Sequence, residues 1–277
     1  EGVDSTARIR VEIHFDDAYS EIAPMVRACH DHGLAVRIFA TGYSFGAERV
    51  MPGDEFLSYL NHDFGTTTAA SRRAANGAAE KLPADGTRAD EWHRFFCDLW
   101  RDDPDQAKGI LDQVRASSDD RPPLESVVMS PAELQGLSRE GCLVGAHGYV
   151  HTRLSGRSAD FVAADTDRIT ELVAEVDAVG ATHFAFPYGS DSDIDATAVA
   201  TLRRAGCTTL YSTLGRDVEI GGAPILGRFQ VGNLDGLNFA ECLDRCISTL
   251  LVDDGLDSLG SNHFLHDVVD VLEDTGW

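Results

Sequence analysis

Two acidic residues near the N-terminus and two histidines in the middle of the chain have the chemistry and spacing of a metal site. Asp16 and Asp17 end an apolar run that reads as a β-strand, and His147 and His151 follow a second such run. Two imidazoles four residues apart plus one carboxylate make a three-ligand set for a divalent metal, with one position open to water. The neighbouring carboxylate stays free as a base, which is typical of metal-assisted hydrolysis.

The segments around these residues alternate between strands and helices. The expected strands cover residues 8–15, 34–40, 126–129, 142–146, 182–186, 208–212 and 225–231, and the expected helices cover residues 20–32, 130–140, 158–179, 194–205 and 237–251. This alternation predicts a parallel sheet, and the number of units favours an irregular β/α barrel over an open sheet. The candidate residues follow strand ends, which meet at one mouth of a barrel, so distant segments can form one site.

Residues 46–123 interrupt the alternation. Residues 66–86 are rich in Thr, Ala, Ser and Gly and predict an exposed loop. Residues 90–115 predict one helix with an apolar stripe. The stripe comprises Trp92, Phe95, Phe96, Leu99 and Trp100. It would either pack against the barrel, the usual role of an amphipathic face, or serve as a sugar-binding platform. We therefore expect a single domain over residues 1–277 with an insertion at about 46–123.

The composition excludes several kinds of partner. The formal net charge is −23, and Lys81 and Lys108 are the only lysines. So acidic a chain is not expected to bind nucleic acid or an anionic membrane surface. No segment approaches the roughly 20 apolar residues of a membrane-spanning helix, so membrane insertion is not expected. An acidic surface would either maintain solubility at high salt or attract a cationic product.

The six cysteines do not form a dense disulfide framework. Most of them stand singly in apolar stretches, where a thiol behaves as a small hydrophobe. Cys242 and Cys246 are one helical turn apart, but no further Cys or His pair nearby completes a metal site. Reduced thiols favour a cytosolic-type environment, with export after removal of a signal segment as the alternative.

Four short motifs occur in order along the chain. Residues 15–18 read Phe-Asp-Asp-Ala, residues 147–151 His-Gly-Tyr-Val-His, residues 184–189 Phe-Ala-Phe-Pro-Tyr-Gly, and residues 226–229 Leu-Gly-Arg-Phe. Together they resemble the motifs of the NodB-like polysaccharide deacetylases, the family-four carbohydrate esterases. That resemblance implies an irregular (β/α)7-type barrel, a deformed TIM-like fold, over roughly residues 8–231. In the first motif, Ala18 stands where the family has glycine.

The resemblance also implies a role for each matching residue. Asp17, His147 and His151 would hold one divalent metal, usually zinc in this family, although Co²⁺, Ni²⁺, Fe²⁺ and Mn²⁺ suit the same ligands. Asp16 would be the general base toward a metal-bound water. The backbone N–H of Tyr188 would stabilise the oxyanion. The implied substrate is an N-acetylated sugar or glycan, for example one containing N-acetylglucosamine, and the implied product is acetate.

Three departures from the family pattern affect these roles. Ala185 stands where many members carry an arginine that orients the base, and we expect Arg228 to take that role from another strand. Gly148 replaces a Ser or Thr, so one hydrogen bond around the metal ligands is missing or supplied elsewhere. The family's last histidine, in a Leu-x-His motif, protonates the leaving amine; the candidate here is His266, with Phe264 in place of that leucine and His263 as the alternative.

Two other functions remain open on the sequence. The first is an amidohydrolase acting on small amides or cyclic imides, with or without a metal. The second is an inactive module that binds glycans. Asp16 argues against the second, because binding alone does not need a base beside the metal ligands.

Overall fold

The computed structural model describes residues 12–47, 49–74, 82–83, 88–118 and 127–228. Its strands are β1 (Glu12–Asp16), β2 (Ala35–Ala40), β3 (Leu143–Ala146), β4 (His183–Ala185), β5 (Thr209–Ser212), β6 (Val218–Ile220) and β7 (Ala223–Gly227). They form one sheet in the order β1-β2-β3-β4-β5-β7-β6. Every neighbouring pair is parallel except β6 and β7, which form an antiparallel hairpin.

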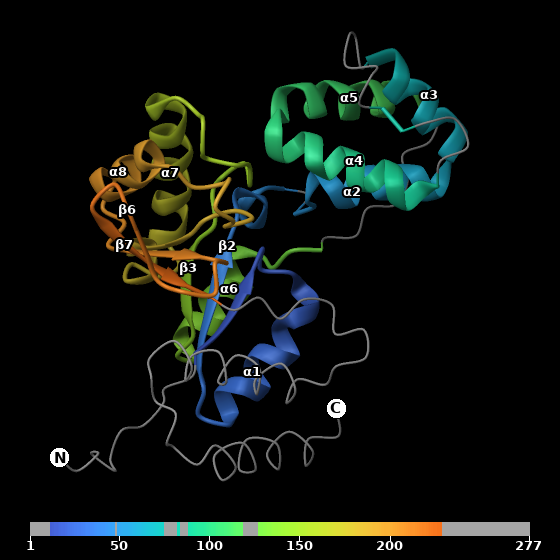
Figure 1. Ribbon diagram of the computed structural model, residues 1–277. Helices are drawn as coiled ribbons and strands as arrows, with labels where there is room; N and C mark the ends of the chain where they lie inside the picture. The colour runs from blue at the N-terminus through green and yellow to red at the C-terminus, as the bar shows by residue number, and fades with distance from the viewer. Residues whose placement is uncertain (1–11, 48, 75–81, 84–87, 119–126, 229–277) are drawn as a thin grey trace, which may run out of the picture.

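The sheet is curled into part of a barrel (Figure 1). In a flat sheet, β1 and β5 would lie roughly 19 Å apart, because three strands separate them. Instead the ring of His14 on β1 lies 5.1 Å from the ring of Tyr211 on β5. Phe39 on β2 lies 5.2 Å from the same tyrosine. These side chains fill the concave face, so the predicted α/β class with an irregular barrel is confirmed.

Helices α1 (Ala23–Asp31), α6 (Pro131–Arg139), α7 (Ala159–Ala174) and α8 (Ala196–Arg204) connect the strands of the barrel. Local sequence explains their boundaries. Ser130 and Glu133 form the predicted capping box at the start of α6. Ser158 and Asp195 cap α7 and α8 by accepting backbone N–H bonds. Apolar side chains of these helices and of the strands form one core cluster, including Val144, Val162, Ile169, Phe184 and Leu202.

The insertion forms a four-helix unit beside the barrel (Figure 1). Its helices are α2 (Pro52–His62), α3 (Phe64–Ala74), α4 (Ala89–Asp102) and α5 (Pro104–Ser117). They surround a second core cluster that includes Phe56, Tyr59, Trp92, Phe96 and Ile110. The aromatic stripe therefore packs mainly within this unit, and the expectation that it packs against the barrel was wrong except at its end. There the Trp100 Nε1–H donates to the carbonyl of Val150 in the barrel.

Three further expectations need correction. Part of the expected loop at 66–86 is helical, because α3 continues to Ala74. The helix expected over 90–115 is two helices, because Asp103 caps α5 and Pro104 occupies its first position. Of the strand expected at 126–129, the described residues 127–129 form one isolated bridge, between Val128 and Tyr19. No helix in the described ranges has the length and hydropathy needed to cross a bilayer.

The cysteines in the described part of the chain are free thiols. They are Cys29, Cys97, Cys142 and Cys207. Burial raises the pKa of the Cys97 thiol to about 11 and that of the Cys207 thiol to about 12. Such thiols are protonated at neutral pH and therefore unreactive, consistent with packing roles. Cys242 and Cys246 lie outside the described residues.

Candidate metal centre and the residues around it

Asp17, His147 and His151 converge at the C-terminal ends of β1 and β3. Asp17 directly follows β1, and His147 directly follows β3. One ligand atom from each of the three residues lies within 4.8 Å of the other two. Asp17 Oδ1 lies 3.2 Å from His151 Nε2 and 3.9 Å from His147 Nε2. The structure thus brings the three predicted ligands around one point, as a divalent ion requires.

The surroundings of these atoms fit a cation. His147 Nδ1 lies 2.8 Å from the carbonyl oxygen of Ala185, so Nδ1 carries the proton and Nε2 is left as the ligand atom. Burial lowers the pKa of His151, which keeps its imidazole neutral at pH 7. Asp17 Oδ1 is buried and forms no hydrogen bond with any described residue. A buried carboxylate oxygen without a donor, facing two imidazole nitrogens, is the partner that a metal ion would satisfy.

Asp16 lies beside this point and is held by Arg228. The guanidinium donates two hydrogen bonds to the carboxylate, of 2.7 Å to Oδ1 and 2.8 Å to Oδ2. Asp16 Oδ2 also lies 3.7 Å from His147 Nε2. Burial alone would raise the pKa of Asp16, but the nearby His147 and Arg228 outweigh it and hold that pKa at about 2. The carboxylate is therefore ionised and fixed in orientation at neutral pH.

Tyr188 lies next to His151, on a turn with left-handed backbone. Its φ is 63°, and no hydrogen bond to a described residue uses its N–H. Thr213, the residue after β5, holds this turn, because its hydroxyl donates to the Tyr188 carbonyl at 2.9 Å. The Tyr188 ring lies 5.0 Å from the His151 ring. Burial raises the pKa of the Tyr188 phenol, so the ring is neutral beside the ligands.

Strained backbone is concentrated at this site. Five described residues other than glycine have positive φ, and four of them are Asp17, Ala18, His151 and Tyr188. Left-handed backbone is unfavourable for residues with a Cβ, and such strain tends to persist where function requires it. Ala18, with a φ of 55°, also shows why glycine suits that position in the family motif.

The loop between the two histidines is held by residues that sequence reasoning missed. Asp165 on α7 is buried and accepts the backbone N–H of Tyr149 and of Val150, both at 2.9 Å. The Val150 carbonyl accepts bonds from the Tyr43 hydroxyl at 3.2 Å and from the Trp100 indole at 3.1 Å. The only signal in the sequence was the glycine at 148, which implied that a hydrogen bond came from elsewhere.

The structure does not place every predicted site residue. Asp16, Asp17, His147, His151, Tyr188 and Arg228 lie together. His266 and its alternative His263 lie outside the described residues.

A comparison with known protein families matches part of this chain to one family. Residues 107–210 match the family model described as polysaccharide deacetylase. The matched segment contains His147, His151 and Tyr188, whereas Asp16 and Asp17 precede it. The resemblance to the NodB-like polysaccharide deacetylases is thus confirmed, and it supports the deacetylation of a carbohydrate. A comparison with curated proteins finds no match.

Several solved structures are loosely similar to this chain. The deacetylase domain of BpsB from Bordetella bronchiseptica has a TM-score of 0.38 at 12% identity, covering 72% of this chain and 62% of its own. A de-N-acetylase from Aggregatibacter actinomycetemcomitans has a TM-score of 0.40 at 11% identity, covering 83% and 74%. IcaB from Ammonifex degensii has a TM-score of 0.33 at 20% identity, covering 70% and 88%. These scores are too low to transfer any residue's role.

Proposed function

We propose that this chain is a metal-dependent carbohydrate N-deacetylase. It would hydrolyse the acetamide of an amino sugar, in a glycan or a glycoside, to an amine and acetate. The observation that carries the proposal is the convergence of Asp17, His147 and His151 beside the ionised, arginine-held Asp16. The match to the polysaccharide deacetylases over residues 107–210 supports the carbohydrate part of the substrate.

The ligand atoms would be Asp17 Oδ1 and the Nε2 atoms of His147 and His151. Zinc is the first expectation, and Co²⁺, Ni²⁺, Fe²⁺ and Mn²⁺ suit the same donors. When bound, such an ion polarises the acetyl carbonyl and makes a water molecule more acidic. Every other part of the reaction depends on protein groups.

Asp16 would accept a proton from the attacking water at a carboxylate oxygen, and Arg228 would keep that carboxylate in position. The N–H of Tyr188, which donates to no described residue, would donate to the acetyl oxygen as it gains negative charge. One fixed donor of this kind can stabilise a transition state by roughly 3 kcal/mol. The leaving amine also needs a proton, and His266 is the candidate donor on the resemblance alone.

The test is acetate release from a panel of N-acetylated substrates, running from free monosaccharide and simple glycosides to chito-oligomers, with O-acetylated sugars and a cyclic imide as comparisons. Each reaction is run before chelation, after it and after zinc is added back. Asp16→Asn is the variant, and the exposed Asp160→Asn is the matched control.

We expect acetate release from one N-acetylated class, lost on chelation and restored by zinc. Asp16→Asn should lower kcat by about 100-fold or more with bound metal unchanged, since a general base contributes on that order. Asp160→Asn should behave as wild type. Turnover of imides alone, or release insensitive to chelation, would instead support the amidohydrolase. Sugar binding without any release from the metal-loaded protein would identify a binding module.

A further inference from the structure

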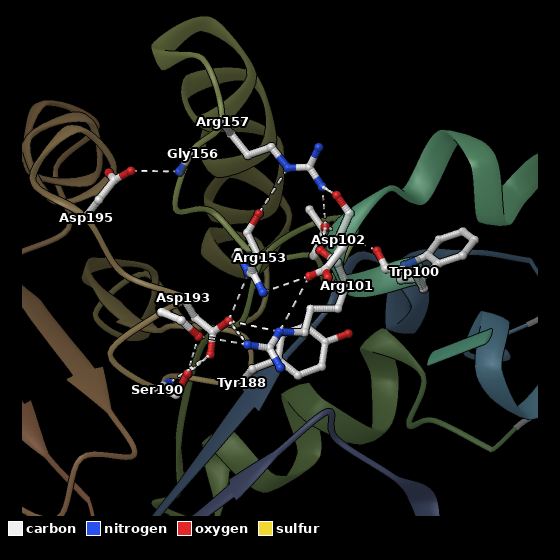
Figure 2. Close-up of polar contacts among 12 residues, drawn as sticks. Trp100, Arg101, Asp102, Arg153, Gly156, Arg157, Tyr188, Ser190, Asp193 and Asp195 are labelled. Carbon is white, nitrogen blue, oxygen red and sulfur yellow. Dashed lines mark hydrogen bonds and ion pairs between the residues drawn. The ribbon is translucent and has the colours of Figure 1, made fainter. Parts of the chain in front are cut away.

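A buried carboxylate joins the four-helix unit to the loop that carries Tyr188 (Figure 2). The Asp193 side chain has no exposed surface. Its Oδ1 accepts from Arg101 Nη2 at 2.6 Å, from Arg101 Nε at 3.0 Å and from Arg153 Nε at 3.2 Å. Its Oδ2 accepts from the backbone N–H of Ser190 at 3.0 Å and from the Ser190 hydroxyl. Both oxygens therefore face donors only, as a buried carboxylate needs.

The two sides of this carboxylate belong to different parts of the fold. Ser190 is two residues after Tyr188, so Oδ2 fixes the turn that presents the Tyr188 N–H. Arg101 lies in the last turn of α4, so Oδ1 of Asp193 ties the Tyr188 turn to the four-helix unit. The Arg101 guanidinium also lies over the Tyr188 ring, 5.2 Å from its centre. The same ring lies 5.0 Å from the His151 ring.

The same end of α4 contacts the loop that follows His151. The Thr152 hydroxyl donates to the carbonyl of Arg101 at 2.8 Å, and Arg153 N–H donates to the same carbonyl at 3.2 Å. Arg157 donates to the carbonyl of Asp102 at 2.8 Å, to the carbonyl of Arg153 at 3.2 Å and to the Thr152 hydroxyl at 3.2 Å. Its hydrogen bonds to described residues do not include Asp193. The junction thus holds two arginines that donate to Asp193, of which Arg101 also lies over the Tyr188 ring. The third, Arg157, joins the helix end to the loop after His151.

We propose that Arg101, acting through Asp193, is a positioning residue that holds the Tyr188 turn in the geometry needed for the oxyanion. This inference rests on the proposed deacetylase function and assigns the four-helix unit a direct part in it. Arg101 does not itself reach the metal ligands by any contact among the described residues. Its effect should therefore fall on the chemical step and leave metal binding intact, because the Tyr188 N–H acts on a charge that exists only in the transition state.

The test compares the metal-loaded full-length protein as wild type, Arg101→Ala, Arg101→Lys, Asp193→Asn and Arg157→Ala. The measurements are kcat and KM on the best N-acetylated substrate, bound metal per chain, circular dichroism and amide hydrogen exchange in the segment 186–193. We expect Arg101→Ala to lower kcat by about 10- to 100-fold, because small displacements of a positioned group cost this much. KM should change less than about threefold, and metal content should not change.

The other variants distinguish a positioning role of Arg101 from a general contribution to folding. Amide exchange in segment 186–193 should rise in Arg101→Ala but not in Arg157→Ala. The kcat of Arg157→Ala should stay within about twofold of wild type. Both substitutions remove a polar contact at the junction, but only Arg101 contacts Asp193 and the Tyr188 ring. Arg101→Lys keeps the positive charge and should recover part of kcat, but not all of it, because a lysine cannot replace the two guanidinium N–H groups that donate to Asp193. Asp193→Asn should resemble Arg101→Ala, since its amide would turn N–H groups toward donors.

The outcomes separate this inference from the function on which it rests. A wild type that releases no acetate from any N-acetylated substrate would refute both. An active wild type whose Arg101→Ala variant keeps its kcat would refute the inference alone. The inference would also be refuted if kcat fell only in proportion to the amount of folded, metal-loaded protein and fell equally in Arg157→Ala.

Discussion

The Asp16–Arg228 pair links residues 212 positions apart in the sequence. Ala185 stands where many NodB-like deacetylases carry an arginine that orients the base, and in this chain Arg228 holds the proposed base, Asp16, instead. The Ala185 side chain is buried, and its carbonyl accepts from His147. An arginine arriving from the end of β7 can reach the same carboxylate because the sheet curls and brings its two sides together.

Arg228→Ala should lower kcat/KM by about 10- to 100-fold while bound metal stays at the wild-type level. The physical reason is that Arg228 contacts Asp16 and none of the three proposed ligands among the described contacts, so its loss frees the base and spares the metal. Arg228→Lys should recover little of this loss, because a lysine cannot form the bidentate pair. The check is steady-state kinetics beside metal analysis on the same preparations. Equal loss of metal and activity would assign Arg228 to the metal site instead.

For single residues, the sequence predicted those whose residue type and spacing already indicate a chemical role. Paired aspartates and a His-x-x-x-His spacing have few other uses at strand ends. It could not predict Asp165 or Asp193. An aspartate on an amphipathic helix or in a polar turn reads as a solvated side chain. Each acquires its role only when a distant loop turns its backbone N–H groups toward it.

Among the elements, the loop from His147 to His151 shows how this chain departs from the deacetylase motif that it resembles. Gly148 has a φ of 76°, which glycine adopts without strain. A Cβ there would lie 3.2 Å from Pro187 Cγ and 3.3 Å from Asp165 Oδ2. The Ser or Thr of the NodB-like deacetylase motif would strain this backbone and would need Pro187 or Asp165 to give way slightly. In this chain Asp165 supplies hydrogen bonds to the loop instead.

Gly148→Ala should destabilise the protein by about 2–3 kcal/mol and weaken metal binding, because it adds both backbone strain and crowding at Asp165. Gly156→Ala is the matched control. Gly156 has the same φ of 76°, but its Cβ would meet nothing within 4 Å. The control should cost only the backbone part, about 1–2 kcal/mol, with metal affinity unchanged. Chemical denaturation and a metal titration measure both quantities. Equal effects of the two substitutions would mean that crowding at Asp165 is unimportant.

Secondary structure was predictable where apolar periodicity was strong and failed where small polar residues pack. Residues 66–86 read as a loop from their Thr, Ala, Ser and Gly content. Part of this segment is α3, whose buried face consists of Thr67, Ala70 and Ser71. The Ser71 hydroxyl donates to the carbonyl one turn back, so its polar group is satisfied inside the helix. The small side chains suit close packing in the unit's core, a tertiary effect that composition cannot reveal.

The whole molecule has two hydrophobic cores, one in the barrel and one in the four-helix unit. The contacts across their junction at the end of α4 are mainly polar, involving Arg101, Arg153 and Arg157. Because polar junctions are weaker than shared apolar cores, the helical unit should be able to open before the barrel does. The proposed metal ligands come from the barrel, yet the loop between the two histidines is bonded to Trp100 of the helical unit. Activity should therefore follow the stability of the helical unit.

Phe96→Ala tests this dependence without touching the site. Phe96 is fully buried in the four-helix core and stacks on Phe56 with ring centres 4.2 Å apart. Its truncation should destabilise that unit by about 3–5 kcal/mol. Amide exchange should rise about 100-fold or more in α5 but not in α8. On heating, activity should be lost at the temperature at which α5 opens, which should be lower than the temperature at which α8 opens. Activity that persists after α5 has opened would show that the barrel alone suffices. Simultaneous opening of α5 and α8 would show that the two cores unfold as one unit.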